Sequence, residues 1–313
     1  MHAVTIDSGQ VTWREQPDPV PGPRDLLVQV HAAGVCRGDL MQRDGMYPPP
    51  AGTAPPDIPG MELAGEVVAV GDQCQRFAVG DRVMAVVWGA GQAELAVVPE
   101  MVAMAVPDGV SWAAAGGFPE NYTTAHDALF TQCELAMGER VCIHGAAGGV
   151  GTAAVELAVA AGCSVVATVR NESLRSGVAA LGATVVAPDA FRDAGPFDVV
   201  LELVGASNFE DNLAALATNG RISIIGVGAG FKAELNLLAL MGTRGRIHGS
   251  TLRPRPLEEK ALVAHRVERH VVPLLASGRV TVPIAATFPF PQVGDAYARF
   301  AAGGKLGKIT LLA

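Results

Sequence analysis

The chain has 313 residues, of which 50% are hydrophobic and 17% charged; this balance fits a compact enzyme and excludes a disordered or fibrous protein. The length exceeds that of a usual single domain, so we expect two domains. The formal net charge of -8 argues against nucleic acid and against an anionic membrane as the main partner, because both require a basic surface.

The N-terminal residues carry no recognisable targeting signal, since no basic segment precedes an apolar one. The most apolar stretch, residues 155–169, is shorter than a membrane-spanning helix and contains Glu156. The cysteines at positions 36, 74, 133, 142 and 163 are scattered and form no CxxC pair. We therefore expect free thiols, a cytoplasmic location and no structural zinc knot.

The first third of the chain has a β-rich pattern. Val-rich runs bounded by Gly-Asp and Pro turns predict strands at residues 25–35, 63–71, 81–88 and 91–99. The Pro-rich stretches 16–25 and 47–60 predict irregular loops, because proline lacks a backbone donor and has a fixed φ. These features indicate a small, strongly bent β domain.

From about residue 119 the pattern changes to alternating strands and helices. Strands are predicted at residues 139–145, 163–169, 183–188, 197–205, 220–228 and 245–251. Helices are predicted between them at residues 148–162, 171–182, 208–218 and 235–243. This alternation is typical of a doubly wound parallel sheet, so the predicted fold class is α/β with a Rossmann domain.

Beyond Pro254 the pattern changes again. A polar helix at residues 257–277 precedes two strands at residues 286–290 and 308–313, which we expect to return to the β-rich domain. The expected division is therefore residues 1–119 with 254–313 for the β-rich domain, and residues 120–253 for the Rossmann domain.

A glycine-rich turn lies between the first strand and the first helix of the predicted Rossmann domain. It has the pattern AxGxxG, with alanine at the first glycine position. Gly148 would let the backbone approach a pyrophosphate, and Gly151 would let the helix pack closely on its strand. The helix N-terminus would supply N–H donors to the phosphates. We predict a dinucleotide site that includes Ala146, Gly148, Gly149, Val150 and Gly151.

The end of the second predicted strand indicates which dinucleotide binds. An NAD-dependent enzyme needs an acidic residue here to accept from the ribose 2′-OH. This chain instead has Arg170, followed by Asn171, and a guanidinium suits a 2′-phosphate. The alternative is that Arg170 is a solvated surface charge. NADPH is the predicted cofactor.

Several motifs occur in a fixed order that resembles the medium-chain dehydrogenase/reductase superfamily. They lie at residues 34–43, 58–71, 79–86, 144–154 and 220–228. Within it, residues 39–50, 118–129 and 249–260 resemble the zeta-crystallin-type quinone oxidoreductases. The resemblance covers essentially the whole chain. It implies a GroES-like fold for the β-rich domain and a homodimer, with residues 245–251 as a pairing edge.

The resemblance also permits a comparison with the zinc-containing members of the superfamily. They place Cys, His and a further Cys where this chain has Cys36, Met61 and Glu120. A thioether is a poor zinc ligand, and a catalytic zinc needs three strong donors. We expect no catalytic metal, and we expect Cys36 to be a thiol in the wall of the site. Many of the quinone oxidoreductases carry Asn at that position, so Cys36 departs from their pattern as well.

The resemblance implies further site residues. Tyr47 would hydrogen-bond the acceptor oxygen, and Thr124, with Asn121 beside it, would contact the nicotinamide or the substrate. The implied cofactor contacts are Gly226, Val227, Ser250, Leu252 and Lys308. Two of them have a structural alternative: Tyr47 could be a packing aromatic beside prolines, and Lys308 a solvated lysine. For Arg37 and Asp39 we expect an ion pair that orients their loop.

These observations predict NADPH-dependent, zinc-independent reduction of quinones by direct hydride transfer. A quinone needs no metal, because its electron-poor ring delocalises the incoming charge. The protein would align the reactants and supply a proton or a hydrogen bond. Two alternatives remain open: an enoyl or α,β-unsaturated ketone reductase of the same fold, and a non-catalytic NADPH-binding protein. The predicted partner is a small quinone or enone.

Overall fold

The computed structural model describes all 313 residues. Contacts within the chain group these residues into two units. Unit 1 comprises Met1–Thr123, Leu252–Gly303 and Lys308–Ala313, and unit 2 comprises Thr124–Thr251 and Gly304–Gly307. The chain therefore passes from one unit to the other four times, including a short return of residues 304–307 to unit 2.

Unit 1 is built on a seven-stranded sheet with the order β14-β15-β3-β4-β5-β7, in which β6 also pairs with β3. The pairs are antiparallel except for β14 and β15. The four strands predicted in the first third and the two predicted near the C-terminus are confirmed. The short strand β7 was not predicted. The strands of the sheet are β3 (Asp25–Val35), β4 (Glu62–Val70), β5 (Arg82–Val86), β6 (Leu95–Pro99), β7 (Ala103–Ala105), β14 (Ile284–Pro289) and β15 (Lys308–Leu312).

A separate hairpin precedes this sheet and has no counterpart in the prediction. Strands β1 (His2–Asp7) and β2 (Gln10–Glu15) pair in antiparallel register. The two residues between them, Ser8 and Gly9, have φ values of +50° and +76°. Positive φ at both central residues is the geometry of a type I′ turn, whose twist suits a two-residue hairpin.

The helices of unit 1 include a break that the sequence pattern did not show. The single helix predicted at residues 257–277 is two helices, α8 and α9, separated at Val271. Pro273 lacks the amide N–H that would continue the α8 hydrogen-bond ladder, so the helix ends before it. The helices are α1 (Arg37–Arg43), α2 (Trp112–Gly117), α3 (Pro119–His126, whose last residues lie in unit 2), α8 (Leu257–His270), α9 (Val272–Ala276) and α10 (Val293–Ala301).

Unit 2 is a six-stranded parallel sheet with the order β10-β9-β8-β11-β12-β13. Counted within the unit, this is the 3-2-1-4-5-6 order of a doubly wound dinucleotide-binding sheet. The six predicted strands and the α/β fold class are confirmed. The strands are β8 (Arg140–Ile143), β9 (Ser164–Thr168), β10 (Thr184–Val186), β11 (Phe197–Glu202), β12 (Leu216–Ile224) and β13 (Arg246–Gly249).

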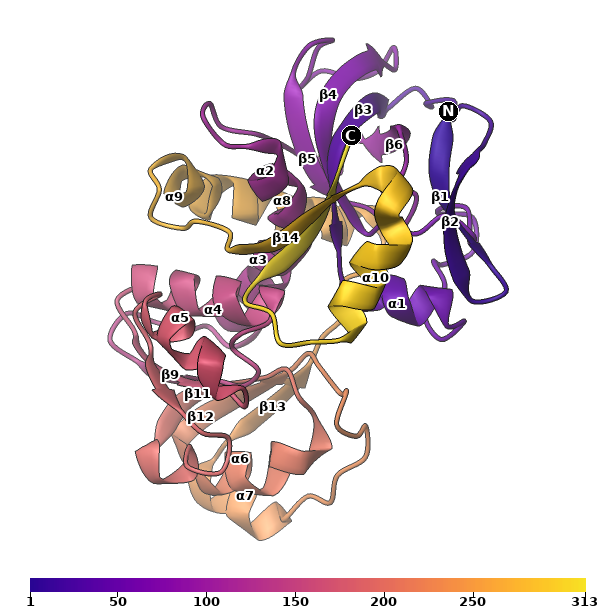
Figure 1. Ribbon diagram of the computed structural model, residues 1–313. Helices are drawn as coiled ribbons and strands as arrows, with labels where there is room; N and C mark the ends of the chain where they lie inside the picture. The colour runs from indigo at the N-terminus through magenta and orange to yellow at the C-terminus, as the bar shows by residue number, and fades with distance from the viewer. The chain divides into compact units, whose positions relative to one another are not determined.

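Helices lie on both faces of this sheet, with α4 on one face and α6 and α7 on the other (Figure 1). Helix α4 packs on β8 and β9, and α6 and α7 pack on β12. The helix predicted at residues 208–218 ends earlier, at Ala214, because Leu216 already begins β12. The helices are α4 (Gly149–Ala160), α5 (Arg175–Ala179), α6 (Phe209–Ala214) and α7 (Leu237–Thr243), with a π-helical turn at Asp127–Gln132 after α3.

All five cysteines are free thiols, as expected. None of the helices has the length and apolar character needed to cross a membrane.

Candidate functional site

The glycine turn of unit 2 joins β8 to α4. Gly145 has φ +61°, a left-handed conformation that favours glycine. Gly148 is the N-cap residue of α4, and no side chain caps this helix. A Cβ added to Gly148 would meet only the carbonyl oxygen of Gly145, at 3.4 Å, so the space in front of the helix is open. The first amides of α4 can therefore donate to an anion such as a phosphate.

Gly151 lies where α4 approaches the glycine turn. A Cβ at this position would be 2.6 Å from both Ala146 Cα and the Gly145 carbonyl oxygen, closer than real contacts allow. The N–H of Ala146 in turn donates to the carbonyl of Thr168, at 3.2 Å. The turn is thus held between its own helix and the end of β9.

The short return of residues 304–307 lies beside the glycine turn. The N–H of Gly307 donates to the carbonyl of Ala147 at 2.9 Å, and Gly307 forms an isolated β-bridge with Gly148. The Nζ of Lys305 donates to the Gly307 carbonyl at 2.7 Å. Sequence reasoning placed this segment with the β-rich domain, and nothing in its Gly-rich composition indicates the pairing.

Arg170 follows β9 and is exposed, and its guanidinium forms no ion pair in the structure. Asn171 shapes the turn behind it: its Oδ1 accepts from the backbone N–H of Ser173 at 3.1 Å and from the Ser173 hydroxyl at 2.8 Å. The neighbouring Arg175, by contrast, pairs with Glu172 at 3.2 Å. Arg170 is therefore the guanidinium of this loop that stays open to a ligand.

Gly226 follows β12 and Ser250 follows β13. A Cβ on Gly226 would collide with the carbonyl oxygen of Leu203, and the Gly226 N–H donates to the Glu202 carbonyl at 3.0 Å. Val227, next to it, is 47% exposed. The hydroxyl of Ser250 donates to Asp127 at 3.3 Å.

The predicted cofactor residues in unit 2 share one feature, which is that each follows the carboxyl end of a parallel strand. In doubly wound sheets ligands bind along this edge. The structure therefore gathers these side chains and turns along one edge of the sheet, although they are far apart in sequence. They are Ala146–Gly151 after β8, Arg170 and Asn171 after β9, Gly226 and Val227 after β12, and Ser250 after β13.

In unit 1, three candidate side chains surround Gly38. The Sγ of Cys36 is 3.8 Å from the Sδ of Met61. A Cβ on Gly38 would lie 2.5 Å from Met61 Sδ and 3.5 Å from both Cys36 Sγ and the Tyr47 ring. Burial raises the pKa of the Cys36 thiol well above its ordinary value, and the charge of Asp39 adds to this shift. Cys36 is thus held as a neutral thiol.

The ion pair expected between Arg37 and Asp39 does not form, so this prediction was wrong. Arg37 is exposed, whereas Asp39 is fully buried. The Asp39 carboxylate instead accepts from the backbone N–H of Cys36 at 2.8 Å and of Gly60 at 3.1 Å. Those amides are already fixed in place, so Asp39 holds the start of α1 against the loop before β4.

Lys308 is buried and forms an ion pair with Glu62, which is also fully buried. The second oxygen of Glu62 accepts from the backbone N–H of Glu120 at 2.9 Å. Burial raises the pKa of Glu62 to about 7, although the Lys308 ammonium opposes this shift. Burial likewise opposes the charge on Lys308, but the attraction of Glu62 raises the pKa of Lys308 above its ordinary value.

This placement corrects the expectation that Lys308 reaches the phosphates of the cofactor. Its ammonium is buried within unit 1, because the Glu62 carboxylate offers a buried counter-charge there. Glu62 was not singled out from the sequence. The available signal was weak, because the strand has a second glutamate, the exposed Glu66, and its sequence does not tell the two apart.

Tyr47 is half-buried, and Arg253 lies over its ring at 5.0 Å. Burial raises the pKa of Tyr47, so its phenol keeps its proton at neutral pH and can donate. Arg253 also donates to the backbone carbonyls of Trp88, at 2.7 Å, and Tyr47. Sequence reasoning missed Arg253, which holds the Tyr47 loop in place.

The remaining two predicted catalytic residues lie on α3. Asn121 is buried, and its side-chain amide donates to the carbonyl of Gly117 at 3.3 Å, so it is engaged within its own segment. Thr124 is 7% exposed and is the first residue of unit 2.

Comparison with known proteins finds a matching family for most of each unit. Residues 22–134 match the family described as alcohol dehydrogenase GroES-like domain, and residues 149–267 match the family described as zinc-binding dehydrogenase. Quinone oxidoreductase from Mus musculus is 31% identical, over 94% of this chain and 91% of that relative. The chain belongs to the medium-chain dehydrogenase/reductase superfamily.

Two further proteins resemble the chain, one in part and one throughout. An erythronolide synthase from Saccharopolyspora erythraea is 46% identical over 144 residues, which are 46% of this chain and 4% of the synthase. A mycobacterial protein whose structure is complexed with NADPH has 25% identity and a TM-score of 0.86, and the match covers 100% of both chains. Medium-chain dehydrogenase/reductases bind nicotinamide cofactors, which agrees with the ligand edge of unit 2.

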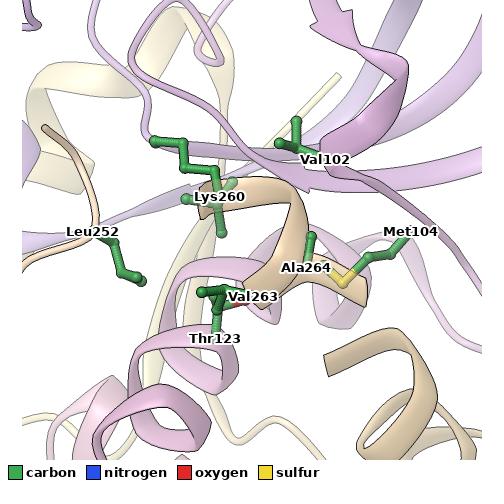
Figure 2. A pocket seen from close by; sticks show the side chains of 8 residues that line it. Val102, Met104, Thr123, Leu252, Lys260, Val263 and Ala264 are labelled. Atoms are coloured by element: carbon green, nitrogen blue, oxygen red, sulfur yellow. The ribbon is translucent and has the colours of Figure 1, made fainter. Parts of the chain in front are cut away.

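Unit 1 of this dehydrogenase/reductase also holds a small pocket (Figure 2). Its free volume of ≈ 10 Å³ is about what one water molecule needs. Leu252, predicted to contact the cofactor, is one of its lining residues. Lys260 is another, and its buried Nζ has no hydrogen-bond partner and lies 4.3 Å from the centre of the Trp88 ring. The lining side chains are Val86, Val102, Met104, Thr123, Leu252, Lys260, Val263 and Ala264.

Proposed function

We propose that this protein reduces quinones with NADPH by direct hydride transfer, without zinc. The observation that carries the proposal is the set of donor atoms around Cys36, in a chain that is 31% identical to a quinone oxidoreductase. The description of the second matching family names zinc, so the fit of these donors to a zinc ion matters.

The donors do not fit a catalytic zinc. The thiol of Cys36 lies 3.8 Å from the thioether of Met61, which is a poor zinc ligand, whereas a catalytic zinc needs three strong protein donors. The carboxylate of Glu62 is already paired with the Lys308 ammonium, so a metal cation would meet a fixed positive charge there. We derive no step through a metal.

The ligand edge of unit 2 fits NADPH. The uncapped start of α4 would take the pyrophosphate, and the open guanidinium of Arg170 would take the 2′-phosphate. Gly226 and Val227 would lie beside the ribose. The turn that they form requires glycine at position 226, because a Cβ there would collide with the Leu203 carbonyl. When bound, NADPH supplies the hydride. The chain's own task on this side is to hold the cofactor in one orientation.

On the acceptor side, Tyr47 is the residue best suited to act on the substrate. Its phenol stays protonated at neutral pH and can donate a hydrogen bond to the quinone oxygen as negative charge develops there. Arg253, stacked on the ring, fixes its position and adds positive charge nearby. We assign Thr124 to the nicotinamide side, and Asn121 to the support of α3.

Anaerobic oxidation of NADPH by an ortho-quinone, with chelator-stripped protein, tests this function. We expect turnover that prefers NADPH over NADH, and we expect it to survive metal removal. Arg170→Ala should remove most of the preference for NADPH and leave the rate with saturating NADH unchanged. Activity that appears only after zinc is added back would contradict the proposal.

The same assay separates the alternative acceptor class. An α,β-unsaturated ketone also accepts a hydride without a metal, because its conjugation delocalises the charge. An enone is therefore the second candidate acceptor. Turnover with an enone, but not with a quinone, would identify the protein as an enone reductase with the same cofactor site.

We also propose that two copies of the chain pair through unit 2. Strand β13 is an edge of the sheet, and an open edge is a template for pairing with a second copy. Beside it in the chain, α7 and the preceding loop expose large apolar side chains: Phe231 (80%), Leu237 (64%), Leu238 (77%) and Met241 (71%). Analytical ultracentrifugation should show a dimer, which Leu238→Glu should dissociate; a wild-type monomer would refute this proposal.

A further inference from the structure

A buried hydrogen-bond network in unit 2 connects the ends of three parallel strands. His144 follows β8, Thr168 ends β9 and Glu202 ends β11. Asn212 of α6 completes the network, and all four side chains are at most 3% exposed. The distances are 3.0 Å from Thr168 Oγ1 to His144 Nδ1, 2.7 Å from His144 Nε2 to Asn212 Oδ1, and 2.7 Å from Asn212 Nδ2 to Glu202 Oε2.

The direction of these hydrogen bonds follows from Glu202. Its Oε1 accepts from the backbone N–H groups of Val204, at 2.6 Å, and Gly205, at 2.8 Å, and its Oε2 accepts from Asn212. Because both oxygens accept, the amide of Asn212 must turn its nitrogen toward Glu202 and its oxygen toward His144.

His144 must then donate from Nε2 to the Asn212 oxygen and accept at Nδ1 from the Thr168 hydroxyl. Burial lowers the pKa of His144, although the charge of Glu202 opposes this, so the ring is neutral and can play both parts. The three hydrogen bonds that link the four side chains can therefore all form with only one assignment of donors and acceptors. This requirement fixes the positions of the side chains relative to one another.

Two of the four residues, Thr168 and Glu202, also contact the backbone of the ligand edge. The Thr168 carbonyl accepts from Ala146 in the glycine turn, at 3.2 Å. Glu202 holds the loop after β11 through its side chain, and its carbonyl accepts from Gly226 at 3.0 Å. Arg170 lies two residues beyond Thr168. Two of the loops proposed to hold the cofactor are therefore hydrogen-bonded to residues of this network, and a third begins just beyond Thr168.

We propose that the network of Thr168, His144, Asn212 and Glu202 positions the cofactor-binding loops, so that it sets the affinity for the dinucleotide and not the rate of hydride transfer. This inference rests on the proposed function of the ligand edge. None of the four residues is catalytic, because we expect the network to act on the cofactor only through the backbone of the neighbouring loops.

Thr168 offers a matched pair of variants. Thr168→Val keeps the shape and removes the hydroxyl, whereas Thr168→Ser keeps the hydroxyl. We expect Thr168→Val to weaken NADPH binding by roughly fivefold, the equivalent of about one neutral hydrogen bond, and Thr168→Ser to restore it. Asn212→Leu leaves both His144 and Glu202 without their partner, and we expect a loss of about tenfold or more.

The measurements are the dissociation constant of NADPH, from the fluorescence of the bound nucleotide, and the kinetic constants with the quinone. The KM for NADPH should rise while kcat at saturating NADPH stays within about twofold of the wild type. Val200→Ala, in the core of β11 and outside the network, serves as the control for lost stability. It should lower the melting temperature without changing the dissociation constant.

Three results would overturn the inference: unchanged NADPH affinity in both Thr168→Val and Asn212→Leu, an equal loss of affinity in Val200→Ala, or a fall in kcat with affinity retained. In each of these the wild type still binds NADPH, so the proposed function stands. A wild type that binds neither NADPH nor NADH would instead remove the proposed function on which the inference rests.

Discussion

Unit 1 buries two lysines in very different surroundings. Lys308, at the start of β15, faces the carboxylate of Glu62, and the two charges satisfy one another. Lys260, on α8, borders a mostly apolar pocket where its amine has no hydrogen-bond partner. Burial opposes the charge of both, yet the pKa of Lys308 is raised, whereas burial, with Arg253 and Arg255 adding to it, lowers that of Lys260 to about 7.

The difference teaches that burial alone does not decide the charge of a side chain in this protein. A counter-charge at contact distance outweighs the loss of hydration at Lys308. Without one, the lysine at position 260 gives up its proton near neutral pH. The two sites should therefore respond in opposite directions to the same substitution.

The largest effect is expected from Lys308→Met. It leaves the Glu62 carboxylate buried without its partner, and we expect a loss of about 3–5 kcal/mol in the free energy of unfolding. Chemical denaturation at pH 7 measures it. The double variant Lys308→Met/Glu62→Gln removes both charges and should recover much of the loss. If the double variant is no more stable than Lys308→Met, the ion pair is not what holds this region together.

Lys260→Met should have the opposite sign and stabilise the protein, by on the order of 3 kcal/mol at pH 7. An unfolded lysine titrates near pH 10.4, whereas Lys260 in the folded chain has a pKa of about 7. Between these values the unfolded chain binds more protons, so the wild type gains stability as pH rises. The advantage of Lys260→Met should be complete below about pH 7 and shrink toward pH 10.

Lys232→Met, the same substitution at an exposed lysine, provides the matched control for Lys260→Met. A pH-independent advantage of Lys260→Met would mean that Lys260 keeps its proton in the folded state.

A smaller loss is expected from Gly117→Ala, which crowds the paired lysine. The added Cβ would lie 2.8 Å from Lys308 Cγ, and the buried ion pair leaves that side chain little freedom to move. We expect a cost of about 1–3 kcal/mol. Gly242→Ala, in α7, meets nothing within 4 Å and should gain about 0.5–1 kcal/mol from helix propensity. If both variants change the melting temperature by the same amount, the Lys308 side chain moves aside at little cost.

The smallest effect should come from Thr123→Val, beside Lys260. The Thr123 hydroxyl is buried without a hydrogen-bond partner, so an isosteric apolar side chain should stabilise the protein by about 1 kcal/mol. A destabilised Thr123→Val would indicate that a bound water satisfies the hydroxyl. Differential scanning calorimetry has the precision for this comparison.

The sequence predicts the parallel sheet of unit 2 well, because its signals are local. Each strand is a Val/Ile-rich run, and Gly148 and Gly151 follow the first strand at the spacing that a phosphate-binding turn requires. The β1–β2 hairpin also had a local signal in Ser8-Gly9, a dipeptide that allows positive φ, but the residues around it alternate too weakly in hydrophobicity.

The chemistry of unit 1 was less predictable, because its decisive contacts join distant parts of the chain. Lys308 is the first residue of β15, and its side chain is buried in an ion pair with Glu62 of β4. Its role therefore depends on a residue that is far away in the sequence. No pattern within the C-terminal segment carries that information. Arg253 is a similar case, since its partners Trp88 and Tyr47 lie on other segments.

The position of β15 in its sheet has a consequence for synthesis. The last strand of the chain pairs with residues 32–35 of β3, one of the first strands to be made. At the usual rates of translation, on the order of ten seconds or more separates the emergence of the two strands. Throughout that interval the end of β3 is an open apolar edge, the kind of surface that aggregates or recruits a chaperone. The emergence of β15, rather than that of the strands made first, is therefore the event that closes the sheet.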